Sequence, residues 1–453
     1  MSANVDLAEV IDRSLSDHVQ TLRELVRVPS ISSDPDRAED MKASAELVER
    51  KFQELGFTTR ICNAVAADGT VGQPAVLGHK SATGNAGTAP TVLLYAHHDV
   101  QPLGELDRWS YPPLELTEIG DRLYGRGSAD DGVGIVVHLA ALAALGDSLP
   151  VNVVVFIEGE EEIGSPAFKA FVEKYKEELS AQVIIVADSN NWTTDIPAIT
   201  SSLRGVASCD VKIEVLEHGV HSGMFGGPVL DAVTLASRLI ATLHDEAGDV
   251  AVAGLGGTSE ADVDWPEADF RRDASVVDGY QLAGTGDLAA RVWTKPAIAV
   301  IGMDARAVDE SSNTIASECT FRLSLRTVPG SDSQESMEAL VSHLHKNRPF
   351  GVRMTVTPVD TGPSYTADLD ASATAILRGA LAEAWGTDPV TIGVGGSIPF
   401  IADFQAAFPE AQVLVTGMED PQANAHAADE SASRSTLRNA ALAEALFLQR
   451  LGD

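Results

Sequence analysis

The sequence of 453 residues contains little cysteine, little positive charge and no long apolar run. Its three cysteines, Cys62, Cys209 and Cys319, lie far apart and form no CxxC pair. Neither a disulfide framework nor a thiolate zinc site is therefore expected, and a reducing cytoplasm is the predicted location. Each cysteine is expected to be a small buried apolar residue.

Positive charge is scarce, because 32 Lys+Arg stand against 66 Asp+Glu and give a formal net charge of −34. This field repels nucleic acids and anionic membrane surfaces, so neither is an expected partner. The best apolar run, residues 133–145, contains His138 and is shorter than the ~20 residues that a spanning helix needs. The N-terminus carries acids where a signal peptide would carry a basic patch and an apolar stretch.

Apolar strands that end in polar residues recur in the first part of the chain. The segments TVLLYAHHDV, VNVVVFIEGEEEIGS and AQVIIVADSNNW all have this pattern, and helical segments alternate with them. Such alternation is typical of a mostly parallel, doubly wound α/β sheet, whose ligands bind at the carboxyl ends of the strands. The pattern therefore places along one edge His97, Asp99, Glu161, Glu162 and Asp188.

The pattern changes near residue 200. SCDVKIEVLE, CTFRLSLRTVP and VRMTVTPV alternate like half-buried strands, with amphipathic helices between them, and this predicts a smaller α+β unit with one solvated sheet face. Residues 245–290 form an acidic, irregular excursion within it. After Gly362 the buried pattern returns. We therefore predict one α/β domain at 1–199 and 363–453, interrupted by an inserted domain at 200–362.

The first candidate residues for chemistry follow the strand at 91–100. In the pair His97 and Asp99, the imidazole can bind a metal through one nitrogen while a carboxylate holds the other. His98 competes for the same role, and a satisfied polar pair is the alternative. Asp130 and Asp131 follow a glycine turn, where an acid can also cap a helix.

Carboxylates crowd the next strand end. Glu158, Glu160, Glu161 and Glu162 lie within five residues, so they repel one another unless solvent or cations neutralise them. Of the adjacent Glu161 and Glu162, one can bind a metal while the other stays free as a general base. Asp188 can supply another oxygen ligand or can be a simple loop acid.

Further candidates lie downstream, and each is unremarkable alone: His221, Arg326, the Gly395–Ser397 turn and His426. Together with the acids, the two histidines favour a hydrolytic metal site with nitrogen and oxygen ligands. A pair of metal ions about 3.5–4 Å apart can ionise a water and polarise a carbonyl. The chain has no GxSxG elbow, Walker loop or GxGxxG after a strand, so no other motif competes for the site.

The order of the motifs resembles that of the dinuclear-metal peptidases and deacylases, a family that includes carnosinase and aminoacylase. YAHHDVQP, YGRGSADDG and EGEEEIGS resemble its first three motifs. HSGMFGG, GGSIPF and His426 follow in the expected order, and the resemblance covers nearly the whole chain. In the last motif, Asp429 stands where the family usually has Asn before the acid Glu430.

The resemblance implies a ligand set for two divalent ions, with zinc expected and manganese as the alternative. His97 and Asp188 would bind one ion. Glu162 and His426 would bind the other. Asp130 would bridge the two.

The resemblance also implies the catalytic roles. Asp99 would orient His97, and Glu161 would be the general base that later protonates the leaving amine. His221, from the inserted lid and dimerisation domain, would stabilise the oxyanion in the site of the partner subunit. The expected assembly is thus a homodimer.

Four further residues are assigned to the substrate by the same resemblance. Asn313 corresponds to a polar residue that reaches across subunits in the family. Arg326 and Ser397, with the backbone at Gly396, would hold the carboxylate of a small peptide substrate.

Three functions remain open at this point. Asp at position 188, together with ARVWTKPAIAVIGM, resembles the carnosinase-like branch and favours a dipeptidase. An N-acyl amino acid deacylase or carboxypeptidase of the same family is the alternative. A non-catalytic metal-binding or ligand-binding protein is the third, and it is disfavoured because every proposed ligand and the base are present.

Overall fold

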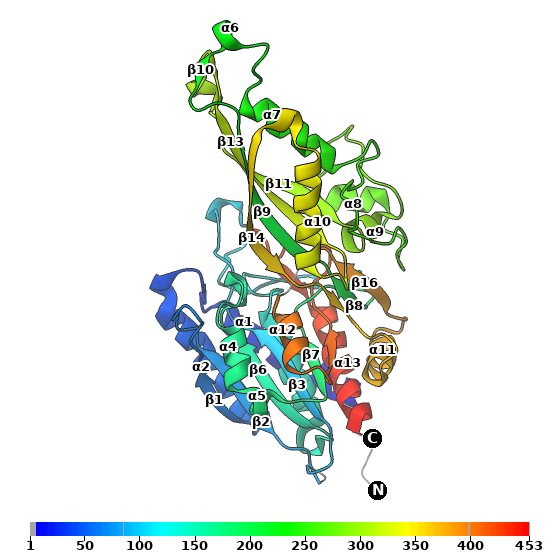
Figure 1. Cartoon of the computed structure of the whole chain (residues 1–453). Helices are drawn as coiled ribbons and strands as arrows, with labels where there is room; N and C mark the ends of the chain where they lie inside the picture. Colours follow the sequence, from blue (N-terminus) through cyan, green and yellow to red (C-terminus); the bar gives the residue numbers. More distant parts are fainter. Residues whose placement is uncertain (1–5, 85, 397–398, 453) are drawn as a thin grey trace. The chain divides into compact units, whose positions relative to one another are not determined.

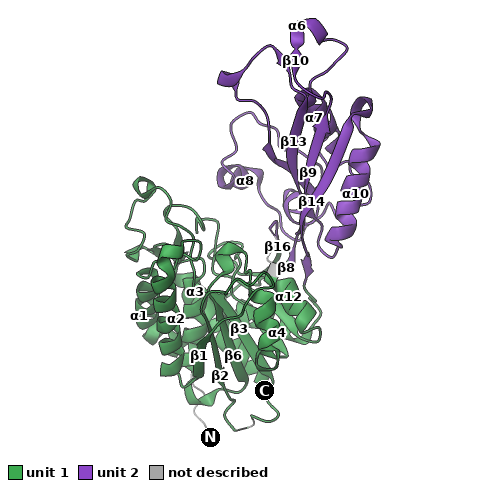
Figure 2. Cartoon of the chain, turned by 60° about the vertical axis from the view of Figure 1, so that its left-hand side comes forward, with its two compact units in different colours: residues 1–201, 367–392, 400–453 green, residues 202–366, 393–399 purple. Residues whose placement is uncertain are grey.

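The computed structural model describes residues 6–84, 86–396 and 399–452 of the chain (Figure 1). They divide into two units, which Figure 2 colours separately. Unit 1 comprises residues 1–201, 367–392 and 400–453, and unit 2 comprises residues 202–366 and 393–399. Each unit has its own hydrophobic core.

The main sheet has nine strands in the order β1-β2-β6-β3-β7-β17-β8-β15, with β16 paired to β8. Its strands are β1 (Thr58–Cys62), β2 (Ala75–Lys80), β3 (Thr91–His97), β6 (Asn152–Glu158), β7 (Val183–Val186), β8 (Ala198–Leu203), β15 (Tyr365–Thr366), β16 (Val390–Val394) and β17 (Gln412–Val415). The central pairs β6·β3, β3·β7 and β7·β17 are parallel. The outer pairs β1·β2, β2·β6, β17·β8 and β8·β15 are antiparallel. The predicted α/β class is confirmed, with the parallel strands at the centre of a mixed sheet.

Helices cover both faces of this sheet, which explains why its central strands are apolar on both sides. The α-helices of this part of the fold are α1 (Leu7–Val26), α2 (Ala38–Glu54), α3 (Gly132–Leu145), α4 (Phe168–Lys174), α5 (Lys176–Leu179), α11 (Ser372–Trp385), α12 (Pro399–Ala407) and α13 (Arg434–Gly452). On one face, α1, α2, α3, α11 and α13 share a single core with the sheet. On the other face, the rings of Tyr95 and Phe156 meet those of Phe168, Phe400 and Phe404 from α4 and α12.

A small antiparallel sheet lies beside the loop that will carry part of the site. Its strands are β4 (Thr117–Ile119), β5 (Arg122–Tyr124) and β18 (Ser431–Ser433), in the order β18-β5-β4. The short 3-10 helices of the whole chain are η1 (Pro35–Arg37), η2 (Leu106–Arg108), η3 (Gly146–Ser148), η4 (Glu161–Ile163), η5 (Ala241–Leu243), η6 (Val308–Glu310) and η7 (Pro349–Gly351).

Unit 2 contains a four-stranded antiparallel sheet in the order β11-β13-β9-β14. Its strands are β9 (Gly205–Glu214), β11 (Ala297–Met303), β13 (Glu318–Thr327) and β14 (Arg353–Gly362), and the pair β10 (Val220–His221) and β12 (Thr314–Ile315) is separate. Its α-helices are α6 (Ser222–Phe225), α7 (Ala232–Ile240), α8 (Glu267–Asp273), α9 (Leu288–Trp293) and α10 (Ser333–Lys346). Burial alternates along β9 and β13, because α7 and α10 pack on one face only.

The cysteines are free, as predicted. Cys209 and Cys319 are buried in the core of unit 2, whereas Cys62 on β1 is only half-buried. None of the described helices is long and apolar enough to cross a membrane.

Candidate metal centre

The carboxyl ends of three parallel strands meet at one edge of the main sheet. β3 ends at His97, which pairs directly with Glu158 at the end of β6. Asp188 follows shortly after β7, whose last residue pairs with Tyr95 of β3. Parallel neighbours end at the same edge, so strands distant in sequence deliver their polar residues to one place.

Six side chains at this edge form two groups that can each hold a metal ion. The first group contains His97, Glu161 and Asp188, and the second contains Asp130, Glu162 and His426; within each group the ligand atoms lie within 4.8 Å of one another. All six residues belong to unit 1. The structure therefore brings together every residue that the sequence assigned to the metals or to the base.

Asp130 lies between the two histidines. Its Oδ1 atom is 2.9 Å from Nε2 of His97, and its Oδ2 atom is 2.8 Å from Nε2 of His426. Nε2 of His426 is also 3.2 Å from Oε2 of Glu162. Each oxygen of one carboxylate thus faces a different ligand group, which is the arrangement that a bridging ligand needs.

His98 takes no part in this arrangement. It is buried, its Nε2 atom lies 2.8 Å from the carbonyl oxygen of Pro74, and it belongs to neither ligand group. The helix-cap alternative for the acids after the glycine turn also fails, because Asp131 at the N-cap of α3 makes no side-chain capping bond.

Asp99 contacts both the ligand His97 and the turn that carries the predicted base Glu161. Its carboxylate is buried, lies 3.4 Å from Nδ1 of His97, and accepts the backbone N–H groups of Glu161 and Glu162 at 3.2 and 3.0 Å. Nδ1 of His97 lies closer, at 3.0 Å, to the backbone carbonyl oxygen of Asp99, so Asp99 orients this ligand through its main chain as well as its carboxylate. The carboxylate also fixes the η4 turn that carries the two glutamates. The sequence predicted only the first of these contacts.

Gln101 is a site residue that the sequence reasoning missed. Its amide Nε2 donates to Oε2 of Glu162 at 2.6 Å. The residue lies inside YAHHDVQP, so its place beside other site residues was the available signal. Such a hydrogen bond fixes the orientation of the Glu162 carboxylate within the second ligand group.

Burial sets the acidity of the carboxylates. It raises the pKa of Glu161 to about 9, and the charge of Asp188 adds to the rise. It raises the pKa of Asp188 to about 7, with the charge of His97 opposing it. Burial also acts to raise the pKa of Asp130, but hydrogen bonds from His426 and His97 outweigh it and leave that pKa lowered.

The donor set fits two divalent ions. The two groups contain two imidazoles and four carboxylates, one of which belongs to the predicted base Glu161. They offer nitrogen and oxygen ligands without a thiolate, which suits Zn²⁺ or Mn²⁺. Hydrogen bonds to Asp130 and Glu162 raise the pKa of His426 to about 11. Because a histidine must be neutral to bind a metal, ion binding at this centre releases protons.

Glu430 is a second site residue whose role the sequence did not give. Its buried carboxylate accepts the backbone N–H groups of Gly127, Ala129 and Asp130 at 3.1, 2.9 and 3.2 Å. It also pairs with Nη1 of Arg126 at 2.5 Å. Burial raises its pKa to about 7, and the charge of Arg126 opposes this rise. Glu430 therefore connects the loop of His426 to the loop of Asp130.

His221 and Asn313 both lie at the β10–β12 pair of unit 2, where their chain neighbours are paired. The backbone N–H of Ser222, next to His221, donates to the carbonyl oxygen of Asn313 at 2.9 Å. Nδ1 of His221 accepts the N–H of Gly223 at 3.1 Å. This bond leaves Nε2 to carry the proton of a neutral imidazole, so His221 can act as a hydrogen-bond donor.

Arg326 and Gly396, two of the residues predicted to hold a carboxylate, also lie in unit 2. Arg326 is on β13, Gly396 follows β16, and Ser397 lies outside the described residues. Arg204, which the sequence reasoning missed, donates from Nε to the carbonyl oxygen of Gly395 at 2.9 Å. Burial lowers the pKa of Arg204 to about 10, and the charge of Arg326 adds to the effect. The guanidinium group of Arg204 therefore contacts this turn directly.

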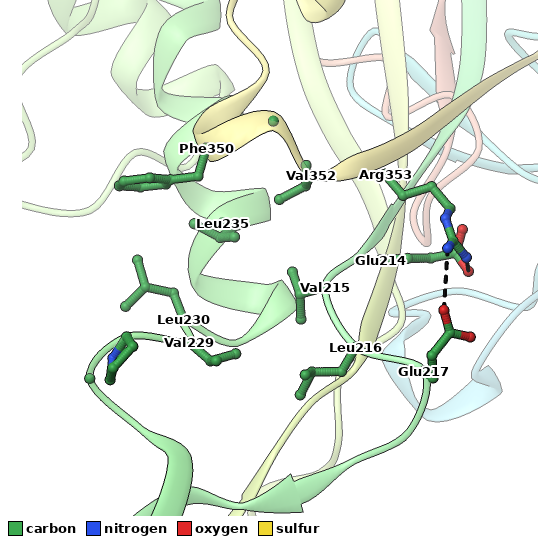
Figure 3. A pocket seen from close by; sticks show the side chains of 13 residues that line it. Glu214, Val215, Leu216, Glu217, Val229, Leu230, Leu235, Phe350, Val352 and Arg353 are labelled. Atoms are coloured by element: carbon green, nitrogen blue, oxygen red, sulfur yellow. Dashed lines mark hydrogen bonds and ion pairs between the residues drawn. The ribbon is translucent and has the colours of Figure 1, made fainter.

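A separate cavity of about 710 Å³ lies within unit 2 (Figure 3). Apolar side chains such as Val215, Leu216 and Phe350 line it, and Arg353 pairs there with Glu214 and Glu217. Its lining contains neither a metal-ligand group nor a predicted catalytic residue.

The chain is similar in sequence and in fold to known peptidases. The chain is 34% identical to the cysteinylglycine-S-conjugate dipeptidase of Corynebacterium striatum, over 96% of this chain and 95% of that protein. It is 28% identical to the beta-Ala-His dipeptidase of Rattus norvegicus, over 88% and 86% of the two chains. Its fold matches the di-peptidase Dug1p from Saccharomyces cerevisiae with a TM-score of 0.79 at 22% identity, over 100% and 99% of the two chains. Residues 93–450 match peptidase family M20/M25/M40, and the chain belongs to that family.

Proposed function

We propose that this chain is a dinuclear metallodipeptidase with Glu161 as its general base. The observation that carries the proposal is the pair of ligand groups that Asp130 links at the edge where Glu161 and Glu162 also lie. The relatives from Corynebacterium and Rattus are named as dipeptidases, which agrees with the prediction from Asp188.

His97 and Asp188 would hold one divalent ion, Glu162 and His426 the other, and Asp130 both. Zn²⁺ is the proposed ion, with Mn²⁺ as the alternative. When bound, such a pair lowers the pKa of a water and polarises the substrate carbonyl.

Glu161 performs the proton transfers. It lies on the η4 turn, which Asp99 holds in place through two backbone N–H groups. Its carboxylate takes a proton from the attacking water and then gives a proton to the leaving amine. Because Glu162 on the same turn serves as a ligand, the base is fixed relative to the reacting atoms.

His221 donates from Nε2 to the oxyanion that forms on the substrate carbonyl. We propose that it does so in the site of a partner subunit, within a homodimer formed through unit 2. Two observations support this assembly. Next to His221, Met224 and Phe225 are 75% and 51% exposed, and the edge strand β11 exposes Ile301 by 59%. Exposed apolar surface of this kind marks interaction sites.

The substrate carboxylate is assigned to Arg326, Ser397 and the backbone of Gly396, with Asn313 as a further polar contact. Arg204, which contacts the same turn through Gly395, is a further guanidinium group of the kind that suits a carboxylate. The prediction of a cytoplasmic location rests on the three free cysteines.

The direct test is a substrate panel run on purified protein with its metal content measured. The panel contains cysteinylglycine, β-alanylhistidine and alanylglycine beside N-acetyl amino acids. We expect two ions per chain and hydrolysis of dipeptides. Hydrolysis confined to N-acetyl amino acids would replace the dipeptidase proposal with the deacylase one.

A further inference from the structure

Most acids around the metal centre already have a partner or a role. Asp99 accepts the backbone N–H groups of Glu161 and Glu162, and Glu160 accepts those of Gln73 and Ala167. Glu158 accepts the hydroxyl group of Tyr95, and Asp429 accepts that of Ser110. Asp420 pairs with Arg122, and Glu430 pairs with Arg126. Asp130, Glu161, Glu162 and Asp188 belong to the ligand groups. Among the described residues, the carboxylate of Glu419 has no hydrogen bond or ion pair.

The backbone holds Glu419 beside the ligand Asp188. The N–H of Glu419 donates to the carbonyl oxygen of Ser189 at 3.3 Å, and its carbonyl oxygen accepts from the N–H of Asn191 at 2.8 Å. The two segments pack so tightly that a Cβ atom at Gly417 would lie 1.3 Å from the Ser189 oxygen. Glu419 is therefore fixed at the same edge as the metal ligands, although it belongs to neither ligand group.

The surroundings of this carboxylate are unfavourable for an unpaired negative charge. Burial raises the pKa of Glu419 well above its usual range, and the charges of Asp130 and Asp188 add to the rise. Two divalent ions would bring four positive charges, which the carboxylates of three ligands and of the base Glu161 would together cancel. The carboxylate of Glu419 then has neither a hydrogen bond nor an ion pair among the described residues, so an ammonium group placed beside it would stabilise its ionised form.

A dipeptide supplies such a cation at the right place. Its ammonium group is attached to the carbon next to the scissile carbonyl, so any group that binds the ammonium must lie beside the reacting atoms. An N-acyl amino acid has no charge at this position. We propose that Glu419 receives the free ammonium group of the substrate and so selects dipeptides over N-acyl amino acids. This inference rests on the proposed dipeptidase function.

The test compares two substrates of nearly the same shape, alanylglycine and propionylglycine, in which hydrogen replaces the ammonium group. In Glu419→Gln, kcat/KM for alanylglycine should fall about 10- to 100-fold, the usual effect of losing one charge-assisted hydrogen bond. The value for propionylglycine should stay within about twofold of the wild type, since it has no charge to lose. If propionylglycine is hydrolysed too slowly to measure, its inhibition constant against alanylglycine hydrolysis is compared between the two proteins instead.

Glu410→Gln is the matched control, because Glu410 is an exposed acid that precedes β17 in the same part of the chain. It should leave both substrates unchanged. The Glu419→Gln variant should still bind two metal ions. In the metal-free form, its melting temperature should be no lower than that of the wild type. An unchanged preference for alanylglycine, or a lost ion, would overturn the assignment of Glu419. Failure of the wild type to cleave any dipeptide would instead overturn the proposed function, and this inference with it.

Discussion

Replacing Glu430 by glutamine tests whether that residue holds the bridging ligand in place. The buried carboxylate accepts three backbone N–H groups of the loop that ends at Asp130, and it pairs with Arg126. An amide has only one accepting oxygen, so Glu430→Gln leaves N–H donors unpaired and a buried guanidinium without its counter-charge. Removing one partner of a buried pair costs about 3–5 kcal/mol. Because the loop carries Asp130, metal affinity should fall as well, by about 10- to 100-fold.

Two measurements separate these effects: denaturant unfolding of the metal-free protein and metal titration of the folded protein. Glu444→Gln is the control, since Glu444 is also a buried acid, 2.8 Å from Nδ1 of His138, but supports no metal ligand. It should lower stability and leave metal affinity at the wild-type value. The reasoning is refuted if Glu430→Gln binds metal as tightly as the wild type, or if it unfolds with a free energy within about 1 kcal/mol of it.

Four further outcomes are expected. Glu161→Gln should lower kcat by at least about 10²–10⁴-fold while keeping both ions; near-normal turnover would show that another residue is the base. Asp130→Ala should lose more metal than His97→Ala or His426→Ala, because Asp130 faces both ligand groups; equal losses by elemental analysis would argue against a bridge. Chelation should lower the melting temperature, and this drop should become smaller as the pH falls below the raised pKa values of the buried carboxylates. Below those values the carboxylates of the metal-free folded protein take up protons and no longer repel one another. A drop in melting temperature that does not change with pH would contradict this. Refolding inactive His221→Ala and Glu161→Gln chains together should restore roughly a quarter of the sites if the partner supplies His221, by counting over a two-fold interface; a mixture that stays inactive after confirmed subunit exchange would place His221 within its own chain.

The strand ends could be read from the sequence because burial dictates composition. β3, β6 and β7 are covered on both faces, so they read as continuous apolar runs, and their polar ends mark the edge that collects His97, Glu161 and Asp188. Alternation along β9 and β13 likewise reveals the one-sided cover of the unit 2 sheet. The order of the motifs supplied His426, whose place in an irregular loop follows no periodicity.

The supporting contacts could not be read in the same way. Glu430 meets the loop of Asp130 only after the chain has passed through unit 2, and hydrogen bonds between such distant loops leave no local pattern. Arg204 and Gly395 are another such pair. Glu419 was also missed, because one acid in an acid-rich stretch is indistinguishable from a solvated loop residue until its neighbours in space are known.

The most direct test of the metal centre is to follow dipeptide hydrolysis while metal is removed and restored. The chelated protein should be inactive, and activity should return in proportion to added Zn²⁺ or Mn²⁺ until two equivalents per chain are bound. The two ligand groups linked by Asp130 predict this stoichiometry. Hydrolysis that survives chelation, or full recovery with a single equivalent, would contradict it.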